Sequence, residues 1–395
     1  MDITITPSPL RGKLQAIPSK SQAHRLLICA AFADRETTLL CPQTNQDIEA
    51  TAGCLRALGA IIDRTTQGYR VHPIRKVPKT AVLNCHESGS TLRFFLPIVA
   101  ALGVDTLFEM EGRLPSRPLS PLWEELERMG CTLSRPSSKT LRCTGKLQPG
   151  SYFIDGGISS QFITGLLFAL PLLSTASRLT VTGKQESVPY IHMTLRALEA
   201  FGVRIPGTDI YEISPQPFRS PGEVWVEGDW SNGAFWLAAK ALGAQLTVSN
   251  LDPASPQGDR AVVEFLEKLE KNTVIDAAQT PDLVPILAVV AAARQGAEFI
   301  NCARLRLKET DRLATTAALI NGLGGKVEIL KDRLIVQGTG LEGGTVDATG
   351  DHRIAMAAAI ASTVCTKPVT ILGAESVKKS YPAFWDDFKL LGGQI

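Results

Sequence analysis

Two kinds of helix alternate along the chain, and the pattern of hydrophobic positions separates them. Helices of the first kind are apolar at nearly every position, rich in Ala, and start beside a polar residue that can cap a helix. They span residues 19–33, 87–102, 158–173, 229–243, 281–293 and 350–363. A helix that is apolar on all sides is buried, and Ser or Asp at its start satisfies backbone N–H groups that have no partner within the helix. We therefore predict six buried helices.

Helices of the second kind are amphipathic and end in an apolar-x-x-apolar-Gly pattern that runs into a β-rich segment. They fall within residues 51–62, 122–133, 192–205, 262–275, 315–330 and 384–395. Their closing positions are Gly59, Gly130, Gly202, Glu270, Gly324 and Gly393, at intervals of 71, 72, 68, 54 and 69 residues. Glycine just past a helix end supplies a left-handed backbone conformation. We predict six surface helices, five of them closed by glycine.

Short β-rich runs, such as residues 178–183 and 333–338, lie between the helices. The chain thus consists of six copies of a unit of about 70 residues, each with a buried helix, a surface helix and strands. Three copies precede residue 226 and three follow it. This pattern predicts an α/β protein of two domains, with the boundary within residues 224–232.

Composition excludes several classes of protein. Apolar residues make up 44% and charged residues 20% of the 395 residues, which is typical of a globular chain and excludes a disordered or fibrous one. The net charge of +2 argues against a nucleic-acid binder. No apolar stretch reaches the roughly 18 residues of a membrane helix, and the first residues lack a signal-peptide pattern. The Cys and His spacings match no metal motif. We expect a cytoplasmic protein without a metal.

The starts of the buried helices are candidate anion sites. If equivalent helices point the same way, the six starts converge between the two halves, and each carries unpaired N–H groups and a partial positive charge. Hydroxyls and cations stand at these starts or one to two turns into the helices, and further cations lie on three loops. With the other residues at the helix starts, the set comprises Ser19, Lys20, Ser21, Arg25, Ser88, Gly89, Ser90, Arg93, Arg117, Ser159, Ser160, Gln161, Asp229, Ser231, Asp282, Arg304, Arg306, Lys308, Arg312, Asp351, His352, Arg353, Lys378 and Lys379. Such a set suits a ligand with several phosphate or carboxylate groups.

Two functions fit this pattern: an enzyme acting on two anionic small molecules, or a module that only binds a polyanion. The carboxylates discriminate between them. Asp282 and Glu309 stand among the cations, where a receptor for anions loses affinity by carrying negative charge. A transfer reaction, in contrast, needs a base and an acid at this place.

The ordered motifs IPSKSQAHR, ESGSTLRF, SRPL, ISSQF, VPYIHMTL, EGDWS, PDLVP, RLKETDRL, DHRIAMA and KKSYPAFW resemble the 5-enolpyruvylshikimate-3-phosphate synthase family over almost the whole chain. The resemblance implies a two-domain inside-out α/β barrel with three βαβαββ repeats in each domain. It implies that residues 1–18 and 228–395 form the C-terminal domain and residues 19–227 the N-terminal domain. It also implies a monomer and a target of glyphosate, which occupies the phosphoenolpyruvate site in this family.

The reaction that the resemblance implies is transfer of the enolpyruvyl group of phosphoenolpyruvate to shikimate 3-phosphate, with release of phosphate and no cofactor. Carried over to this chain, the shikimate 3-phosphate contacts are Lys20, Ser21, Arg25, Ser159, Ser160, Gln161, Ser187, Asp282 and Lys308. The phosphoenolpyruvate contacts are Lys20, Gly89, Arg117, Gln161, Arg312, Arg353 and Lys379. Asp282 is the expected base, Glu309 the expected proton donor, and Lys20 the third catalytic residue.

The main alternative within the same fold is an enzyme like UDP-N-acetylglucosamine enolpyruvyltransferase. That family carries a reactive Cys in the loop before its phosphoenolpyruvate Arg, and residues 111–118 of this chain contain no Cys. The chain departs from the shikimate family at Arg304, often an Asn, and at His192, often acidic. Neither departure removes a charge that the chemistry needs.

Overall fold

The predicted alternation of buried and amphipathic helices is confirmed by the computed structural model, which describes all residues from 1 to 395. The buried helices are α1 (Lys20–Ala31), α3 (Gly89–Leu102), α5 (Ser160–Ala169), α7 (Trp230–Ala241), α9 (Val284–Ala293) and α11 (His352–Ala361). The amphipathic helices are α2 (Gln46–Ala57), α4 (Leu122–Arg128), α6 (Val188–Ala200), α8 (Val262–Lys268), α10 (Arg312–Gly322) and α12 (Phe384–Leu390). Every residue of α11 is buried, as expected of a helix with almost no polar side chains.

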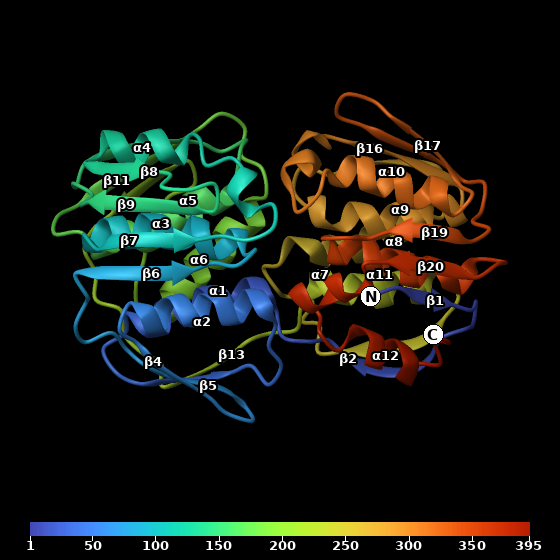
Figure 1. Cartoon of the computed structure of the whole chain (residues 1–395), viewed down its shortest axis with the longest axis horizontal. Helices are drawn as coiled ribbons and strands as arrows, with labels where there is room; N and C mark the ends of the chain where they lie inside the picture. The colour runs from blue at the N-terminus through green and yellow to red at the C-terminus, as the bar shows by residue number, and fades with distance from the viewer. The chain divides into compact units, whose positions relative to one another are not determined.

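The chain divides into two units, each with its own hydrophobic core. The N-terminal unit is Lys20–Val226, and the C-terminal unit joins Met1–Ser19 to Glu227–Ile395. Figure 1 labels the α-helices and most of the strands of both units. Short 3-10 helices precede or follow several of the α-helices: η1 (Leu114–Ser116), η2 (Leu170–Leu172), η3 (Gly258–Ala261), η4 (Pro281–Leu283), η5 (Ala303–Leu307), η6 (Ser362–Val364) and η7 (Ala374–Lys379).

In the N-terminal unit, three sheets pack around the buried helices, with strand orders β13-β3-β5-β4, β6-β7-β9-β8 and β10-β11-β12. The strands are β3 (Thr37–Leu40), β4 (Ile61–Arg64), β5 (Gly68–His72), β6 (Thr80–Asn84), β7 (Asp105–Glu109), β8 (Cys131–Ser134), β9 (Thr140–Gly145), β10 (Ser151–Asp155), β11 (Ser177–Thr182), β12 (Ile210–Ile213) and β13 (Glu223–Trp225). The second repeat, β6-α3-β7-α4-β8-β9, has the full βαβαββ order. In the first sheet, β13 pairs in parallel with β3 and so occupies the place that β6 has beside β7.

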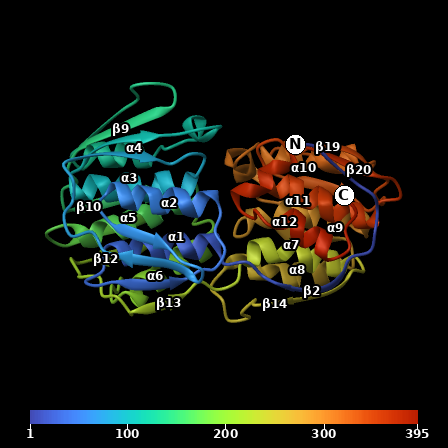
Figure 2. The same ribbon diagram turned by 60° about the horizontal axis from the view of Figure 1, so that its bottom comes forward.

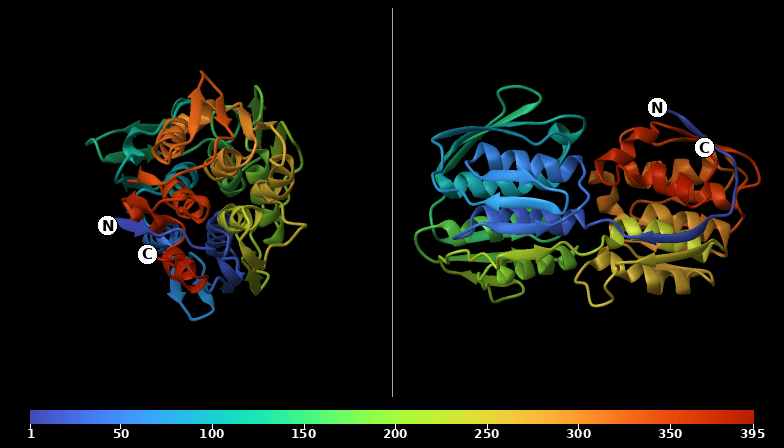
Figure 3. Two further views of the ribbon diagram at one scale, coloured as in Figure 1. Left: turned by 90° about the vertical axis from the view of Figure 1, so that its right-hand side faces the viewer. Right: turned by 90° about the horizontal axis from the view of Figure 1, so that it is seen from below.

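In the C-terminal unit the sheets have the orders β15-β16-β18-β17, β1-β20-β19 and β14-β2. The strands are β1 (Ile3–Ile5), β2 (Arg11–Gln15), β14 (Gln245–Ser249), β15 (Thr273–Asp276), β16 (Gly296–Ile300), β17 (Lys326–Ile329), β18 (Leu334–Gln337), β19 (Gly344–Asp347) and β20 (Val369–Leu372). The first residues of the chain complete two of these sheets, because β1 pairs with β20 and β2 with β14. Figures 2 and 3 show the blue β2 lying along the yellow β14.

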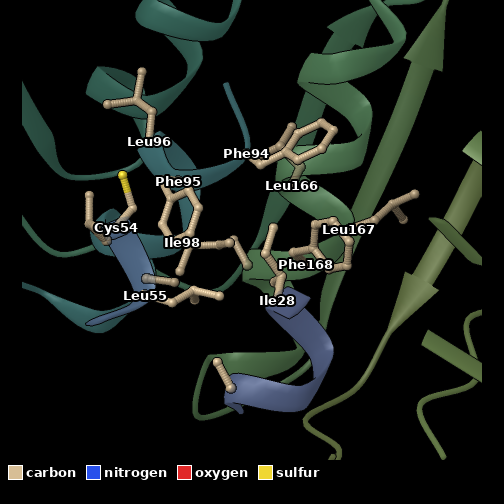
Figure 4. Close-up of a cluster of buried hydrophobic side chains, with 14 of the residues drawn as sticks. Ile28, Cys54, Leu55, Phe94, Phe95, Leu96, Ile98, Leu166, Leu167 and Phe168 are labelled. Atoms are coloured by element: carbon tan, nitrogen blue, oxygen red, sulfur yellow. The ribbon is translucent and has the colours of Figure 1, made fainter. Parts of the chain in front are cut away.

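The core of the N-terminal unit lies between its inner helices and its sheets. Ile28 from α1, Leu55 from α2, Phe95 from α3 and Leu167 from α5 are all fully buried and meet in the cluster of Figure 4. Close packing of this kind fixes the positions of the helices relative to one another. It therefore fixes where the polar residues at the helix starts are held.

The predicted closing glycines have the left-handed backbone at four positions, Gly59, Gly130, Gly202 and Gly324, with φ from +79° to +106°. The prediction was wrong for the last helix, where Gly392, at φ +100°, has this conformation in place of Gly393. The reason is that α12 ends at Leu390 with Leu391 as its C-cap, one residue earlier than the pattern indicates.

Candidate active site

Asp282 is the centre of a cluster of cations in the C-terminal unit. It lies in η4, the 3-10 turn that leads into α9. Its Oδ1 accepts from Arg312 Nη1 at 2.8 Å and lies 3.1 Å from Lys308 Nζ, and its Oδ2 accepts from Arg353 Nη2 at 3.1 Å. Three of the predicted site cations therefore meet at one predicted carboxylate.

These cations decide the protonation state of Asp282. Burial alone opposes ionisation, but Arg353, Lys308 and Arg312 together outweigh it, so the pKa of Asp282 lies well below its usual range, with Glu309 acting in the opposite sense. Burial also lowers the pKa of Lys308, although the negative charge of Asp282 opposes that shift. Asp282 is consequently a carboxylate at neutral pH and can accept a proton.

Arg312, the first residue of α10, connects three carboxylates. It is 1% exposed, and its Nη2 donates to Glu309 Oε2 at 2.6 Å and its Nε to Asp351 Oδ2 at 2.8 Å, in addition to the bond to Asp282. Burial lowers the pKa of its guanidinium, but Asp351, Glu309 and Asp282 raise it further, and the net shift is upward. The planar guanidinium suits this role because its several donors point in different directions.

Asp351 was predicted only as a polar residue at a helix start, but it also organises the cations. It is fully buried and caps α11 by accepting from the Arg353 N–H at 3.0 Å. It also accepts a hydrogen bond from Thr310 Oγ1 at 2.8 Å. Because it also holds Arg312, one carboxylate fixes the backbone at Arg353 and the side chain of Arg312. The remaining predicted cation of this unit, Lys379, lies buried at the end of η7.

A second buried acid, Asp259, lies in the same unit and was not predicted from the sequence. It is 1% exposed and accepts a hydrogen bond from Ser231 Oγ at the start of α7. Burial raises the pKa of Asp259 to about 6, and Asp282 and Asp229 add to that shift while Arg353 and Ser231 oppose it. The Gln-Gly-Asp turn that holds it carried no pattern that distinguishes a buried acid from an exposed one.

The raised pKa of Asp259 predicts a pH-dependent stability. Between about pH 4 and pH 6 the folded protein binds more protons at this position than the unfolded chain, so its stability falls as the pH rises through that range. Asp259→Asn imitates the neutral carboxyl group. The free energy of unfolding of the variant minus that of wild type should therefore increase from pH 4 to pH 7, by about 3 kcal/mol at most. Urea unfolding at both pH values measures the gain, and a stability difference that does not vary with pH would contradict this prediction.

In the N-terminal unit, the start of α1 carries two of the predicted cations. Lys20 Nζ lies 3.0 Å from Asp47 Oδ2, a carboxylate in the first turn of α2 that belongs to none of the predicted site residues. Arg25, one turn further along α1, is 2% exposed and is oriented by Thr194 Oγ1 and by the carbonyl oxygens of Ser21 and Tyr190. Burial lowers the pKa of Arg25 to about 10, with Tyr190 and Cys29 opposing the shift, so its guanidinium is still charged at neutral pH.

Gln161 connects the starts of α5 and α3. Its Oε1 accepts from Arg93 Nη1 at 2.7 Å, and its Nε2 donates to Ser90 Oγ at 2.9 Å. Gly89, the first residue of α3, faces the guanidinium of Arg117, because a Cβ built on Gly89 would lie only 2.5 Å from Arg117 Nη1. Glycine at this position therefore lets an arginine approach the start of a helix.

The predicted serines lie at or just inside helix starts, with Ser21 in the first turn of α1. Ser159 caps α5 by accepting from the Gln161 N–H at 3.3 Å, and Ser160 is the first residue of that helix. Ser187 stands at the N-cap position of α6 without a capping bond from its side chain, and it is buried with a left-handed backbone, at φ +56°. Non-glycine residues in this conformation cost free energy and are concentrated at functional sites. Ser187 is therefore a stronger candidate than its sequence context indicated.

In the C-terminal unit the structure brings Lys308, Arg312 and Arg353 into contact with Asp282, and in the N-terminal unit it places Gly89 beside Arg117. No group of three or more His, Cys, Asp or Glu side chains is arranged to hold a metal ion. None of the helices combines the length and the apolar character needed to cross a bilayer. Repeated α/β units with cations, hydroxyls and an ionised carboxylate at their helix starts are typical of an enzyme for anionic small molecules.

Comparison with known proteins gives the family. A model described as EPSP synthase (3-phosphoshikimate 1-carboxyvinyltransferase) matches residues 5–278 and 271–388. The 3-phosphoshikimate 1-carboxyvinyltransferase of Clostridium kluyveri is 41% identical, with 100% of this chain and 98% of that protein aligned. The corresponding protein of Clostridium acetobutylicum is 40% identical over the same shares. A solved structure of EPSP synthase from Acinetobacter baumannii has a TM-score of 0.81 at 22% identity, and covers 99% of this chain and 98% of that one, so it shows the fold.

The chain belongs to the EPSP synthase family. The family predicted from the motifs is thereby confirmed, together with the α/β fold class and the assignment to an enzyme, a 3-phosphoshikimate 1-carboxyvinyltransferase of the shikimate pathway.

Proposed function

We propose that this protein transfers the enolpyruvyl group of phosphoenolpyruvate to the 5-hydroxyl of shikimate 3-phosphate, and that Asp282 and Glu309 carry out the proton transfers. The supporting observation is the carboxylate of Asp282, which Lys308, Arg312 and Arg353 hold ionised. Glu309 is bound to the guanidinium of Arg312 as well. We propose further that it acts in the cytoplasm as a monomer that needs no cofactor.

The reaction has two stages. In the first, Asp282 takes the proton of the 5-hydroxyl while the hydroxyl oxygen bonds to the central carbon of phosphoenolpyruvate. Glu309 protonates the methylene carbon in the same stage. In the second, the bond from that carbon to the phosphate oxygen breaks and the departing phosphate takes the proton from Asp282, while Glu309 takes a proton back from the methyl carbon and so restores the double bond. The products are the enolpyruvyl ether and phosphate, and the two carboxyl groups return to their starting states.

Glu309 needs a proton before it can donate one. Its Oε2 lies 2.6 Å from Arg312 Nη2. The substrates bring several negative charges to the cluster, and like charges favour protonation of a neighbouring carboxylate. Substrate binding itself therefore supplies the condition for proton uptake by Glu309.

We assign the remaining residues from their match to the motifs of the family. Shikimate 3-phosphate is held by cations, hydroxyls and one amide: Lys20, Ser21, Arg25, Ser159, Ser160, Gln161, Ser187 and Lys308. Phosphoenolpyruvate is held by Lys20, Gly89, Arg117, Gln161, Arg312, Arg353 and Lys379. Lys20 and Gln161 belong to both sets, and the bonds of Gln161 to Arg93 and Ser90 hold its amide in a defined orientation.

The decisive experiment measures phosphate release from phosphoenolpyruvate with each of two acceptors. Shikimate 3-phosphate should support turnover, and UDP-N-acetylglucosamine should not. Turnover with the nucleotide sugar alone would assign the chain to the sister activity. Binding of both anions without any phosphate release would leave only the polyanion-binding alternative.

Glyphosate sensitivity tests the assignment of Gly89. Gly89→Ala places a methyl group against Arg117 Nη1, so that the guanidinium must shift and both phosphoenolpyruvate and glyphosate bind less well. Glyphosate is the longer ligand and should lose more. We expect wild type to be inhibited, and the inhibition constant to rise about tenfold or more beyond any rise in KM for phosphoenolpyruvate. Equal factors for the two constants would show that Gly89 does not line this site.

A further inference from the structure

Two series of buried hydrogen bonds connect the inner helices of the N-terminal unit, and the chemistry proposed above uses neither. In the first, the α1–α3 link, His24 Nδ1 lies 2.7 Å from Thr51 Oγ1, which lies 2.8 Å from Thr91 Oγ1. Thr91 Oγ1 then donates to Ser88 Oγ at 2.8 Å. All four side chains are at most 1% exposed. Ser88 caps α3 and directly precedes Gly89.

The α1–α3 link has a fixed direction. A hydroxyl group donates only one hydrogen. Since Thr91 uses its hydrogen for Ser88, Thr51 donates to Thr91, and His24 Nδ1–H donates to Thr51. His24 is then a neutral ring with its proton on Nδ1, and its buried Nε2 has no partner. Burial supports this form because it lowers the pKa of His24 to about 3, with smaller effects of Asp47, Lys20 and Arg25.

The second series, the α5–α1 link, ends on a different residue. Thr164 Oγ1 lies 2.9 Å from Thr194 Oγ1, and Thr194 donates its hydrogen to the carbonyl oxygen of Tyr190 at 2.9 Å. Thr164 is therefore the donor in the bond between the two threonines. Thr194 also accepts from Arg25 Nε at 2.9 Å, so this link ends on the guanidinium of Arg25.

We infer that the two links are positioning devices with separate targets: the α1–α3 link sets the Ser88 cap and the Gly89 N–H for phosphoenolpyruvate, and the α5–α1 link sets Arg25 for shikimate 3-phosphate. The inference rests on the proposed binding roles of Gly89 and Arg25. Thr51 and Thr164 are fully buried, and neither belongs to a proposed binding set. Each acts on a substrate only through the residues that it orients.

Loss of the Thr51 or the Thr164 hydroxyl should weaken binding of the corresponding substrate. Without the Thr51 hydroxyl, His24 Nδ1–H and Thr91 Oγ1 both lose a buried partner, and the cap of α3 is free to shift. Binding groups must be held to within about 0.5 Å of the productive geometry, so a small displacement of the cap weakens contact with an anion. The same reasoning applies to Arg25 when Thr194 loses its donor.

The test compares Thr51→Val with Thr164→Val, which is a matched pair. Both remove one hydroxyl from a fully buried threonine; the Thr51 hydroxyl makes bonds of 2.7 and 2.8 Å, and the Thr164 hydroxyl makes one of 2.9 Å. We expect Thr51→Val to raise KM for phosphoenolpyruvate about fivefold, the equivalent of one net hydrogen bond, with KM for shikimate 3-phosphate changed less than about twofold. Thr164→Val should raise KM for shikimate 3-phosphate by the same factor and change KM for phosphoenolpyruvate less than about twofold. Serine at either position keeps the hydroxyl and should restore both constants.

Equal effects of the two valine variants on both substrates, or lower unfolding stability with unchanged Michaelis constants, would overturn the inference. If a valine variant does not fold, the corresponding alanine variant is read in the same way. Arg117→Gln and Arg25→Gln, measured in parallel, separate this inference from the proposed function. If these two variants leave both Michaelis constants unchanged, the proposed binding roles are wrong. If they raise the constants as expected while the threonine variants do not, only the inference fails.

Discussion

Replacing Asp282 by Asn should lower turnover by about 100-fold or more while both substrates still bind. The amide has the size of the carboxyl group but accepts no proton at neutral pH. Arg353, Lys308 and Arg312 lower the pKa of Asp282 against the effect of burial, so the wild-type group is an ionised carboxylate at neutral pH, which the amide cannot be. Steady-state kinetics with shikimate 3-phosphate and phosphoenolpyruvate measure the effect.

Asp311→Asn is the matched control for this variant. Asp311 lies in the same segment of the chain, caps α10 by accepting from the Ala314 N–H, and forms a partly exposed pair with Arg306 at 3.0 Å. Asparagine caps helices as well as aspartate does, so turnover should stay within about twofold, since an exposed pair contributes little. Turnover of Asp282→Asn within about threefold of wild type would remove Asp282 from its role as the base.

Arg312→Met should abolish activity and lower the free energy of unfolding by about 3–5 kcal/mol. Arg312 is 1% exposed and bonds to Asp282, Glu309 and Asp351. Without the guanidinium these carboxylates face one another in a buried site, where uncompensated charge is costly. Guanidinium chloride unfolding measures the loss of stability.

Arg333→Met provides the comparison for Arg312→Met. Arg333 pairs with Glu298 at the same 2.8 Å distance that Arg312 Nη1 has to Asp282, but its side chain is 52% exposed. An exposed pair contributes about 0–1 kcal/mol, so this variant should be nearly as stable as wild type and fully active. If both variants lost the same free energy of unfolding, burial would not be what makes Arg312 important.

The local pattern of hydrophobic and polar residues was sufficient to predict the helices and the family of this protein. The six apolar helices and six amphipathic helices follow from periodicity, because a helix without a polar face has no stable place at the surface. Short motifs such as KETDR and DHRIAMA predicted the family. They also contain the three cations that contact Asp282, namely Lys308, Arg312 and Arg353. The last helix shows the precision of such patterns, since its closing glycine is Gly392 and not Gly393.

What only the tertiary structure decided is which of these groups face one another. Arg312 and Asp351 are 39 residues apart and Lys20 and Asp47 are 27 apart, and no periodicity within one helix connects them. The low pKa of Asp282, the raised pKa of Asp259 and the direction of the α1–α3 link all depend on neighbours from other helices and on burial. Hydrophobic pattern depends on the local period of the chain, whereas the electrostatic state of a side chain depends on distance in space and on access to water, which exist only once the helices have packed.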